Sequence, residues 1–110
     1  MKLLGWKSLH RGSLRGFIDI EVEVGNGRRL QILECSVHTG PNGPWVALPG
    51  KPQLDRDGNI RRKANGKPEY VSVLRWGDAQ TRDRFSSAVI KLLREHYPHA
   101  LDDVAAEAAA

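Results

Sequence analysis

The chain has 110 residues, 40% of them hydrophobic and 27% charged, and a formal net charge of +4 at pH 7. This length and composition predict one small domain and leave no room for a second core. The single cysteine excludes an intramolecular disulfide, and the four scattered histidines lack the spacing of a structural zinc site. The first apolar run, Met1–Trp6, is broken by Lys2 and Gly5 and is too short for a signal peptide or a membrane span. We therefore expect a cytoplasmic protein that does not contact a membrane.

The positive charge is concentrated in the second half of the chain. Residues 51–94 carry eleven Lys and Arg against five Asp and Glu, whereas residues 95–110 carry four acidic residues and no Lys or Arg. A basic face is typical of proteins that bind phosphate-bearing polymers, so nucleic acid is the expected partner. The alternative is that these cations serve only solubility.

Three strands are expected in the first 40 residues, at Leu3–His10, Leu14–Val24 and Arg28–Thr39. The intervening Gly25-Asn26-Gly27 tolerates the positive φ angles that a tight hairpin needs. The second strand alternates apolar and acidic residues, which predicts one buried and one solvated face. In the third strand the apolar residues change parity after Ile32, so the strand either contains a bulge or is covered on both sides. We expect this third strand to be central in the sheet.

A fourth, short strand is expected at Trp45–Leu48 and a last strand at Tyr70–Trp76. Between them, residues 51–67 contain almost no apolar side chains and are punctuated by glycine and proline. This composition predicts a loop or a flexible β-ribbon. No internal repeat is apparent along the chain.

One helix is expected after the strands, with Asp78 as its N-cap, Tyr97 as its last residue and Pro98 as its stop. Helical spacing places one buried stripe at Phe85, Ala88, Val89, Leu92, Leu93 and His96 or Tyr97. The order of elements predicts an α+β domain over residues 1–98, a small antiparallel sheet of about five strands followed by the helix. Residues 99–110 are expected to form a flexible, acidic, alanine-rich tail.

Two groups of cations are candidate phosphate contacts. The helix presents a basic stripe opposite its apolar face, and the loop between the last two strands carries Arg and Lys beside flexible backbone. The candidates are Lys51, Arg56, Arg61, Arg62, Lys63, Lys67, Arg84, Lys91 and Arg94. The alternative for both groups is an ordinary solvated surface.

Aromatic residues near the loop are candidates for stacking on unpaired bases. Trp45 and Tyr70 could stack if they are exposed, while the alternative is that they belong to the core. Trp76, at the junction between sheet and helix, is expected to be structural.

No catalytic arrangement is recognisable, so we expect no enzyme and no small-molecule substrate. Cys35 lies in the most apolar strand and is expected to be a buried, inert thiol. The run from Asp55 fails as a calcium loop, because Gly66 stands at the twelfth position, where a bidentate Glu is required. No metal and no cofactor are expected.

Three segments resemble the stage V sporulation protein G (SpoVG) family: residues 14–22, residues 33–38 and above all Gly40–Lys51. The resemblance covers about residues 2–97, and it implies a small antiparallel sheet with a C-terminal helix, dimerisation through strands, and regulatory nucleic-acid binding without catalysis. By the same resemblance, Lys51 corresponds to a basic residue of the family and Asp57-Gly58 to its turn. The helix positions around Thr81-Arg82 and Lys91 correspond only loosely.

The chain departs from that family in three respects. Lys51-Pro52 replaces a Lys-Arg pair, the loop between Gly58 and Tyr70 is longer and more basic, and the acidic tail is additional. Charge, sequence pattern and resemblance together lead us to expect a homodimeric, non-enzymatic protein that binds the phosphates of DNA or RNA and acts in regulation. The alternative is a protein-interaction adaptor that uses a sheet edge or an apolar strand face.

Overall fold

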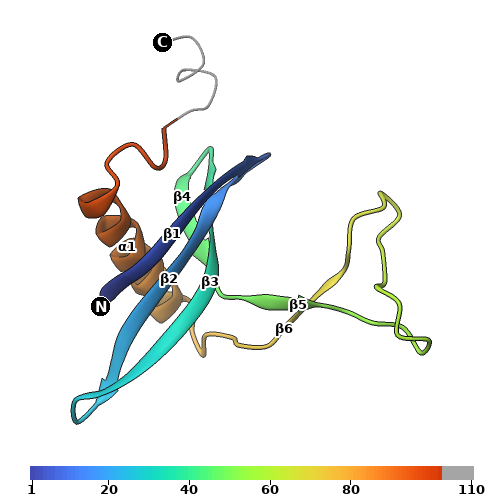
Figure 1. Ribbon diagram of the computed structural model, residues 1–110, viewed down its shortest axis with the longest axis horizontal. Helices are drawn as coiled ribbons and strands as arrows, with labels where there is room; N and C mark the ends of the chain where they lie inside the picture. Colours follow the sequence, from blue (N-terminus) through green and yellow to red (C-terminus); the bar gives the residue numbers. More distant parts are fainter. Residues whose placement is uncertain (103–110) are drawn as a thin grey trace.

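A computed structural model describes residues 1–102 and has the predicted α+β architecture, with an antiparallel sheet, one helix and a projecting arm (Figure 1). The four-stranded sheet follows chain order, β1-β2-β3-β4, and a separate two-stranded sheet pairs β5 with β6. The elements are β1 (Lys2–Arg11), β2 (Leu14–Gly25), β3 (Arg28–Gly40), β4 (Gly43–Ala47), β5 (Gly50–Pro52), β6 (Tyr70–Ser72) and α1 (Ala79–His96).

The hairpin of β2 and β3 forms the centre of the main sheet. Its turn is the expected one, with Asn26 at φ 51° and Gly27 at φ 73° between the paired residues Gly25 and Arg28. Ile18 and Ile20 of β2 are fully buried on the side of the helix, while the acidic residues between and after them face away from it. The alternation predicted for this strand is confirmed as far as Ile20. Beyond it, Val22 is only half-buried and Val24 is exposed, so the predicted buried face does not extend to the end of the strand.

The parity change in β3 is a bulge, the first of the two predicted possibilities. Cys35 pairs with Ile18 and Ile32 with Ile20, so Leu33 and Glu34 together stand opposite the single residue Asp19. Glu34 has a φ of 58°, and its backbone N–H donates to Asp19 Oδ1 at 2.7 Å. The bulge returns Cys35 to the helix side of the sheet.

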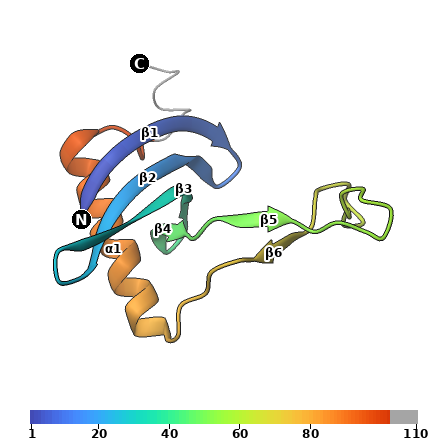
Figure 2. The ribbon, with the colours of Figure 1, turned by 60° about the horizontal axis from the view of Figure 1, so that its bottom comes forward.

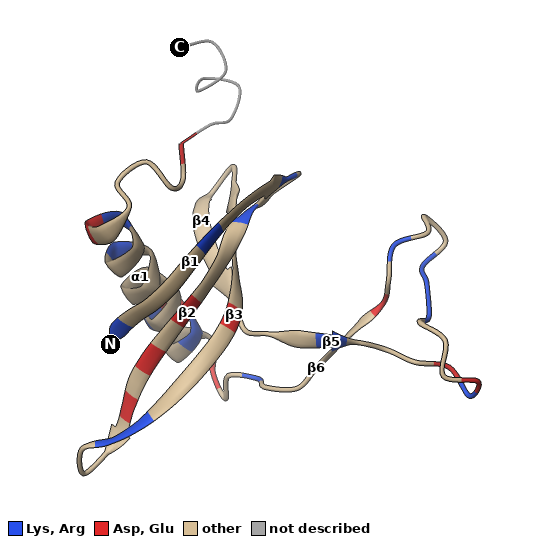
Figure 3. Ribbon diagram, in the orientation of Figure 1, with Lys and Arg blue, Asp and Glu red and all other residues tan. Residues whose placement is uncertain are grey.

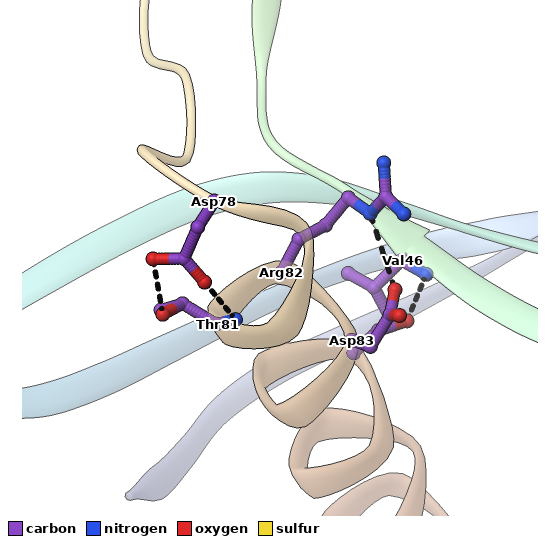
Figure 4. A network of polar contacts seen from close by, with 6 residues as sticks. Val46, Asp78, Thr81, Arg82 and Asp83 are labelled. Atoms are coloured by element: carbon purple, nitrogen blue, oxygen red, sulfur yellow. Dashed lines mark hydrogen bonds and ion pairs between the residues drawn. The ribbon is translucent and has the colours of Figure 1, made fainter.

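The helix packs across one face of the sheet and covers the core (Figure 2). Asp78 is its N-cap as predicted, since its carboxylate accepts from the Thr81 backbone N–H at 2.7 Å and from the Thr81 hydroxyl at 2.9 Å (Figure 4). The Ser86 hydroxyl accepts from the Val46 N–H at 2.7 Å and so ties the helix to β4.

The predicted buried stripe of the helix is partly wrong. Its buried residues are Phe85, Val89, Ile90 and Leu93. Ala88, His96 and Tyr97 are exposed, and Leu92 is only half-buried. The buried row follows the i, i+4 series from Phe85 to Leu93, and the next member, Tyr97, is the C-cap and has left the helical path with φ −135°.

Two further boundaries differ from the prediction. The last strand ends at Ser72 and not at Trp76, and it pairs only with β5, outside the main sheet. Of the predicted tail, residues 99–102 form a turn in which Ala100 and Leu101 pack against the core. Residues 103–110 of the predicted tail lie outside the described residues.

Residues 50–72 form a projecting arm that leaves the sheet on the side away from the helix (Figures 1 and 2). The molecule measures 48 × 44 × 24 Å, with a radius of gyration of 15.7 Å. This radius exceeds the ~13 Å of a compact chain of similar length. The arm therefore stands apart from the core.

Candidate nucleic-acid interface

The end of the arm is divided into two short hairpins that meet at a three-way junction. Three backbone hydrogen bonds close a ring: Gln53 N–H donates to Glu69 O, Glu69 N–H to Arg61 O, and Arg61 N–H to Gln53 O, at 2.8, 2.9 and 2.8 Å. One hairpin runs from Leu54 to Ile60 and the other from Arg62 to Pro68. The junction residues stand eight positions apart, so each hairpin is one period of the chain.

The two hairpins share one backbone geometry. Asp55 N–H donates to Asn59 O, and Lys63 N–H donates to Lys67 O, both at 2.8 Å. Each turn then closes on a glycine of positive φ, 81° in one and 84° in the other, at positions 58 and 66. A type I turn followed by a left-handed glycine is a common three-residue hairpin connection. The two hairpins therefore repeat a backbone geometry, although their sequences share only the glycine.

The two hairpins differ in charge. The first, the acidic hairpin 54–60, contains Asp55 and Asp57 with one cation between them. The second, the basic hairpin 62–68, contains Arg62, Lys63 and Lys67 and no acidic residue. Figure 3 shows the two hairpins side by side at the end of the arm, with only blue segments on one and mixed colours on the other.

The predicted loop cations therefore occupy different environments. Arg56 lies between the two aspartates of the acidic hairpin, and Arg61 lies at the junction, where its Nε is 3.8 Å from a Glu69 carboxylate oxygen. Arg62 donates from Nη1 to Gly66 O at 3.0 Å, which fixes its side chain over its own hairpin. Lys51 is exposed on β5, between the main sheet and the junction.

The helix cations form a second, separate group. Arg84, Lys91 and Arg94 are exposed, as predicted for the basic stripe. Lys91 and Arg94 line a groove of about 580 Å³ between the helix and Pro44 of β4. The main sheet lies between this stripe and the arm, so one subunit does not present the two groups as one surface (Figure 3).

Both predicted stacking residues are exposed. Trp45 is 42% exposed, and its indole stacks on the imidazole of His38, with ring centroids 5.1 Å apart and planes 9° apart. Tyr70, at the start of β6, is 65% exposed. Trp76 instead packs on Phe85, with centroids 4.7 Å apart, and its predicted structural role is confirmed.

A cavity of about 680 Å³ lies where the base of the arm meets the sheet face opposite the helix. Its walls come from β2 and β3 on one side, from β5, β6 and the flanking loops on the other. They include Phe17, Ser36, His38, Leu48 and Tyr70. Sequence reasoning missed this cavity, because it depends on how the arm leaves the sheet.

No protein-family model, curated protein or solved structure matches this chain. Within residues 1–102, no helix combines the length and the apolar character that crossing a membrane requires. In the same residues, no three His, Cys, Asp or Glu side chains are grouped closely enough to hold a metal ion.

His38 is held between two serine hydroxyls, with Nδ1 3.1 Å from Ser13 Oγ and Nε2 3.0 Å from Ser36 Oγ. Burial lowers the pKa of His38 from its ordinary value of 6.5, because desolvation disfavours the imidazolium form. The unfolded chain then binds more protons than the folded one as the solution is acidified. We therefore expect the free energy of unfolding to fall below pH 6.5 and to level off below the folded-state pKa.

Urea unfolding at about pH 7.5 and pH 5 tests this expectation with wild type and His38→Gln. Wild type is expected to lose more stability on acidification than the variant. Equal losses in the two proteins would assign the pH dependence to other groups.

Cys35 is fully buried, and its pKa is raised to about 11 by desolvation first and by the nearby Asp19 carboxylate second. The thiolate is the reactive form of cysteine, so this side chain is a poor nucleophile at neutral pH. We expect a thiol reagent to label Cys35 at pH 8 only as fast as the protein unfolds, and at once in denaturant. Rapid labelling of the native protein would contradict the buried position.

Proposed function

We propose that this protein binds nucleic acid, with the basic hairpin as its principal phosphate contact. The observation that carries the proposal is the opposite charge of two hairpins of the same backbone geometry. The acidic hairpin folds with Asp55 and Asp57 at positions that correspond to Lys63 and Asn65 of the basic one. The turn itself therefore does not require cations, and either sign of charge would keep it soluble. A polyanionic partner explains why one of the two hairpins carries cations.

The position of the basic hairpin fits this role. It stands at the far end of the arm, where its cations reach beyond the body of the protein (Figure 1). Arg62, Lys63 and Lys67 face no acidic partner among the ion pairs of the described residues. Phosphate groups along a groove or a strand would supply that missing counter-charge and release bound counterions.

The helix stripe is a second contact within the same proposal. Arg84, Lys91 and Arg94 lie on the opposite side of the sheet from the arm (Figure 3). Within one subunit, these cations would contact a different stretch of nucleic acid from the arm. In a dimer, the stripe of one subunit would contact the stretch that the arm of the other subunit binds. Cytoplasmic location and membership of the SpoVG family are further parts of this proposal.

We also propose that the protein acts as a homodimer. The outer edge of β1 has no partner strand in the described part of the chain, and Leu4, Val24 and Leu30 expose 39%, 59% and 49% of their surface. Exposed edges and apolar residues of this kind favour association with a second copy. A dimer would also double the number of phosphate contacts on one particle.

Sedimentation at micromolar concentration in about 0.15 M salt tests the dimer without nucleic acid. The expected species has twice the chain mass of 12.3 kDa. A single species at the chain mass would contradict the dimer but would leave binding by one subunit intact.

The second candidate function is a protein-interaction adaptor. The observation that favours it is the groove between α1 and β4, which includes Pro44 and Ile90 beside the polar helix residues. Strand addition to β4 is hindered, because the Val46 N–H already donates to Ser86. The groove is therefore the better docking place for this alternative.

Binding of labelled oligonucleotides at two salt concentrations separates the two functions. A nucleic-acid-binding protein is expected to bind at about 0.05 M salt and to lose affinity steeply by about 0.2 M. Absence of binding at the lower concentration, to single-stranded or double-stranded DNA and RNA, would refute the proposal and favour the adaptor.

A further inference from the structure

We propose that the ligand is a single-stranded nucleic acid, one base of which enters the cavity at the base of the arm and stacks on Tyr70. This inference rests on the proposed function and adds the class of nucleic acid to it. In this arrangement the backbone of the strand follows the arm, so that its phosphates pass Lys51 and reach the basic hairpin. The cavity and the basic hairpin then hold different parts of the same strand.

The walls of the cavity suit a base and not a phosphate. They contain no Lys or Arg, and their one charged residue is Glu34. A carboxylate at this place repels phosphate but accepts hydrogen bonds from the amino groups of a base. The hydroxyls of Ser36 and Ser72 add donors and acceptors, while Phe17 and Leu48 provide apolar surface. Its volume of about 680 Å³ falls within the range of about 300–1,000 Å³ typical of ligand pockets.

Tyr70 is the ring that a base can reach. It is 65% exposed although it belongs to the cavity wall, and no other described side chain stacks on it. Its strand partner is Pro52, whose fixed ring limits local motion of β5. An exposed tyrosine on a short, paired strand is a suitable platform for an unpaired base.

The charges around the cavity favour one path for the bound nucleic-acid strand. Lys51 is adjacent in sequence to the wall residues Gly50 and Pro52, and beyond it along the arm come the junction and then the basic hairpin. Lys51 and the basic hairpin thus lie along the arm, whereas Glu34 lies at the cavity wall on the main sheet. Lys7 of β1 lines an adjoining hollow on that side, together with Phe17 and Glu34. A strand with its base in the cavity is drawn outward along the arm by its phosphates.

Double-stranded nucleic acid does not fit this arrangement. In a duplex the bases are paired and stacked, so a base would have to be extruded before it could reach Tyr70. In a single strand the base is already free. We therefore expect a single strand to bind more tightly than the same strand annealed to its complement.

The test measures fluorescence anisotropy with a labelled single strand of about 15 nucleotides, and with the duplex made from it. Tyr70→Ala is expected to weaken single-strand binding roughly 5- to 100-fold, as alanine substitution at stacking sites does. Tyr70→Phe keeps the ring and is expected to bind like wild type. Tyr70→Leu keeps apolar volume without an aromatic face and is expected to match Tyr70→Ala.

Tyr97→Ala is the matched control, because Tyr97 is also an exposed tyrosine, at 44%, but lies at the end of the helix, which packs on the opposite face of the sheet. It is expected to leave affinity unchanged. Thermal unfolding of each variant shows that the fold is retained, which exposed tyrosines allow.

The outcomes distinguish this inference from the proposed function. If wild type binds nucleic acid but prefers the duplex, or if Tyr70→Ala retains full single-strand affinity, the inference is overturned and the proposed function stands. If Tyr70→Ala changes the sedimentation mass and not the affinity, the cavity holds a second copy of the chain, which also overturns the inference. If wild type binds no nucleic acid, both are overturned.

Discussion

Combined replacement of Arg62, Lys63 and Lys67 by alanine is expected to weaken nucleic-acid binding roughly tenfold or more at about 0.15 M salt. Each lost phosphate contact reduces the release of counterions, so the slope of log affinity against log salt should fall by about two units for a single strand. The thermal midpoint should hardly change, because these side chains are exposed and belong to no core. Anisotropy titrations at three or more salt concentrations measure both quantities.

Arg56→Ala is the matched control, since Arg56 is an exposed cation in the acidic hairpin. Its removal is expected to change the slope by much less than the roughly 0.7 units that one phosphate contact contributes, because Asp55 and Asp57 flank it and repel phosphate. Arg61 is left out of the triple variant, because it faces Glu69 at the junction. If the triple variant retains both affinity and salt slope, the basic hairpin is not the binding site.

Ile90→Ala is expected to reduce the free energy of unfolding by about 2–5 kcal/mol, the usual result of truncating a buried Ile or Leu. Ile90 is 6% exposed and packs in the core between helix and sheet. Tyr97→Ala is expected to cost less than about 1 kcal/mol, because Tyr97 is an exposed cap residue. Urea unfolding with a common m-value compares the two variants directly.

This pair of substitutions decides which face of the helix is buried. The sequence pattern placed Tyr97 or His96 in the stripe and omitted Ile90. A large loss at Tyr97 with a small one at Ile90 would contradict the packing described here and favour the face that the pattern indicated.

The central hairpin was predictable because its signals are local. Alternating residues in β2 and the turn residues Asn26 and Gly27 each act within a few positions. The bulge in β3 was only partly predictable. The parity change after Ile32 left two possibilities, and the choice depends on the Asp19 carboxylate, which accepts the Glu34 N–H from across the sheet.

The buried face of the helix was only partly predictable, because it depends on where the helix ends and on how it crosses the sheet. Phe85 and Leu93 obey the helical spacing, but the spacing alone does not say that the buried row turns toward Ile90 and away from Ala88. The departure of Tyr97 from the helix removes the next member of the row. These features belong to tertiary packing and not to periodicity.

The only sequence feature that the two hairpins share is a glycine, flanked by polar residues, at the same place in each turn. Asp57-Gly58-Asn59 and Asn65-Gly66-Lys67 stand eight residues apart with glycine at the same place. A segment with almost no apolar residues predicts one loop or ribbon, and the spacing of the two glycines alone does not predict two hairpins. The ring of hydrogen bonds at the junction joins residues up to 16 positions apart, which no local pattern indicates.

The most direct test of the central claim is an NMR titration of the ¹⁵N-labelled protein with a single-stranded oligonucleotide. Each hairpin has one glycine at the same place of the same turn, so Gly58 and Gly66 are matched reporters of the two hairpins. We expect large shifts for the amides of residues 62–68, including Gly66, and small ones for Gly58. Equal shifts in both hairpins, or shifts confined to the helix, would contradict the assignment of binding to the basic hairpin.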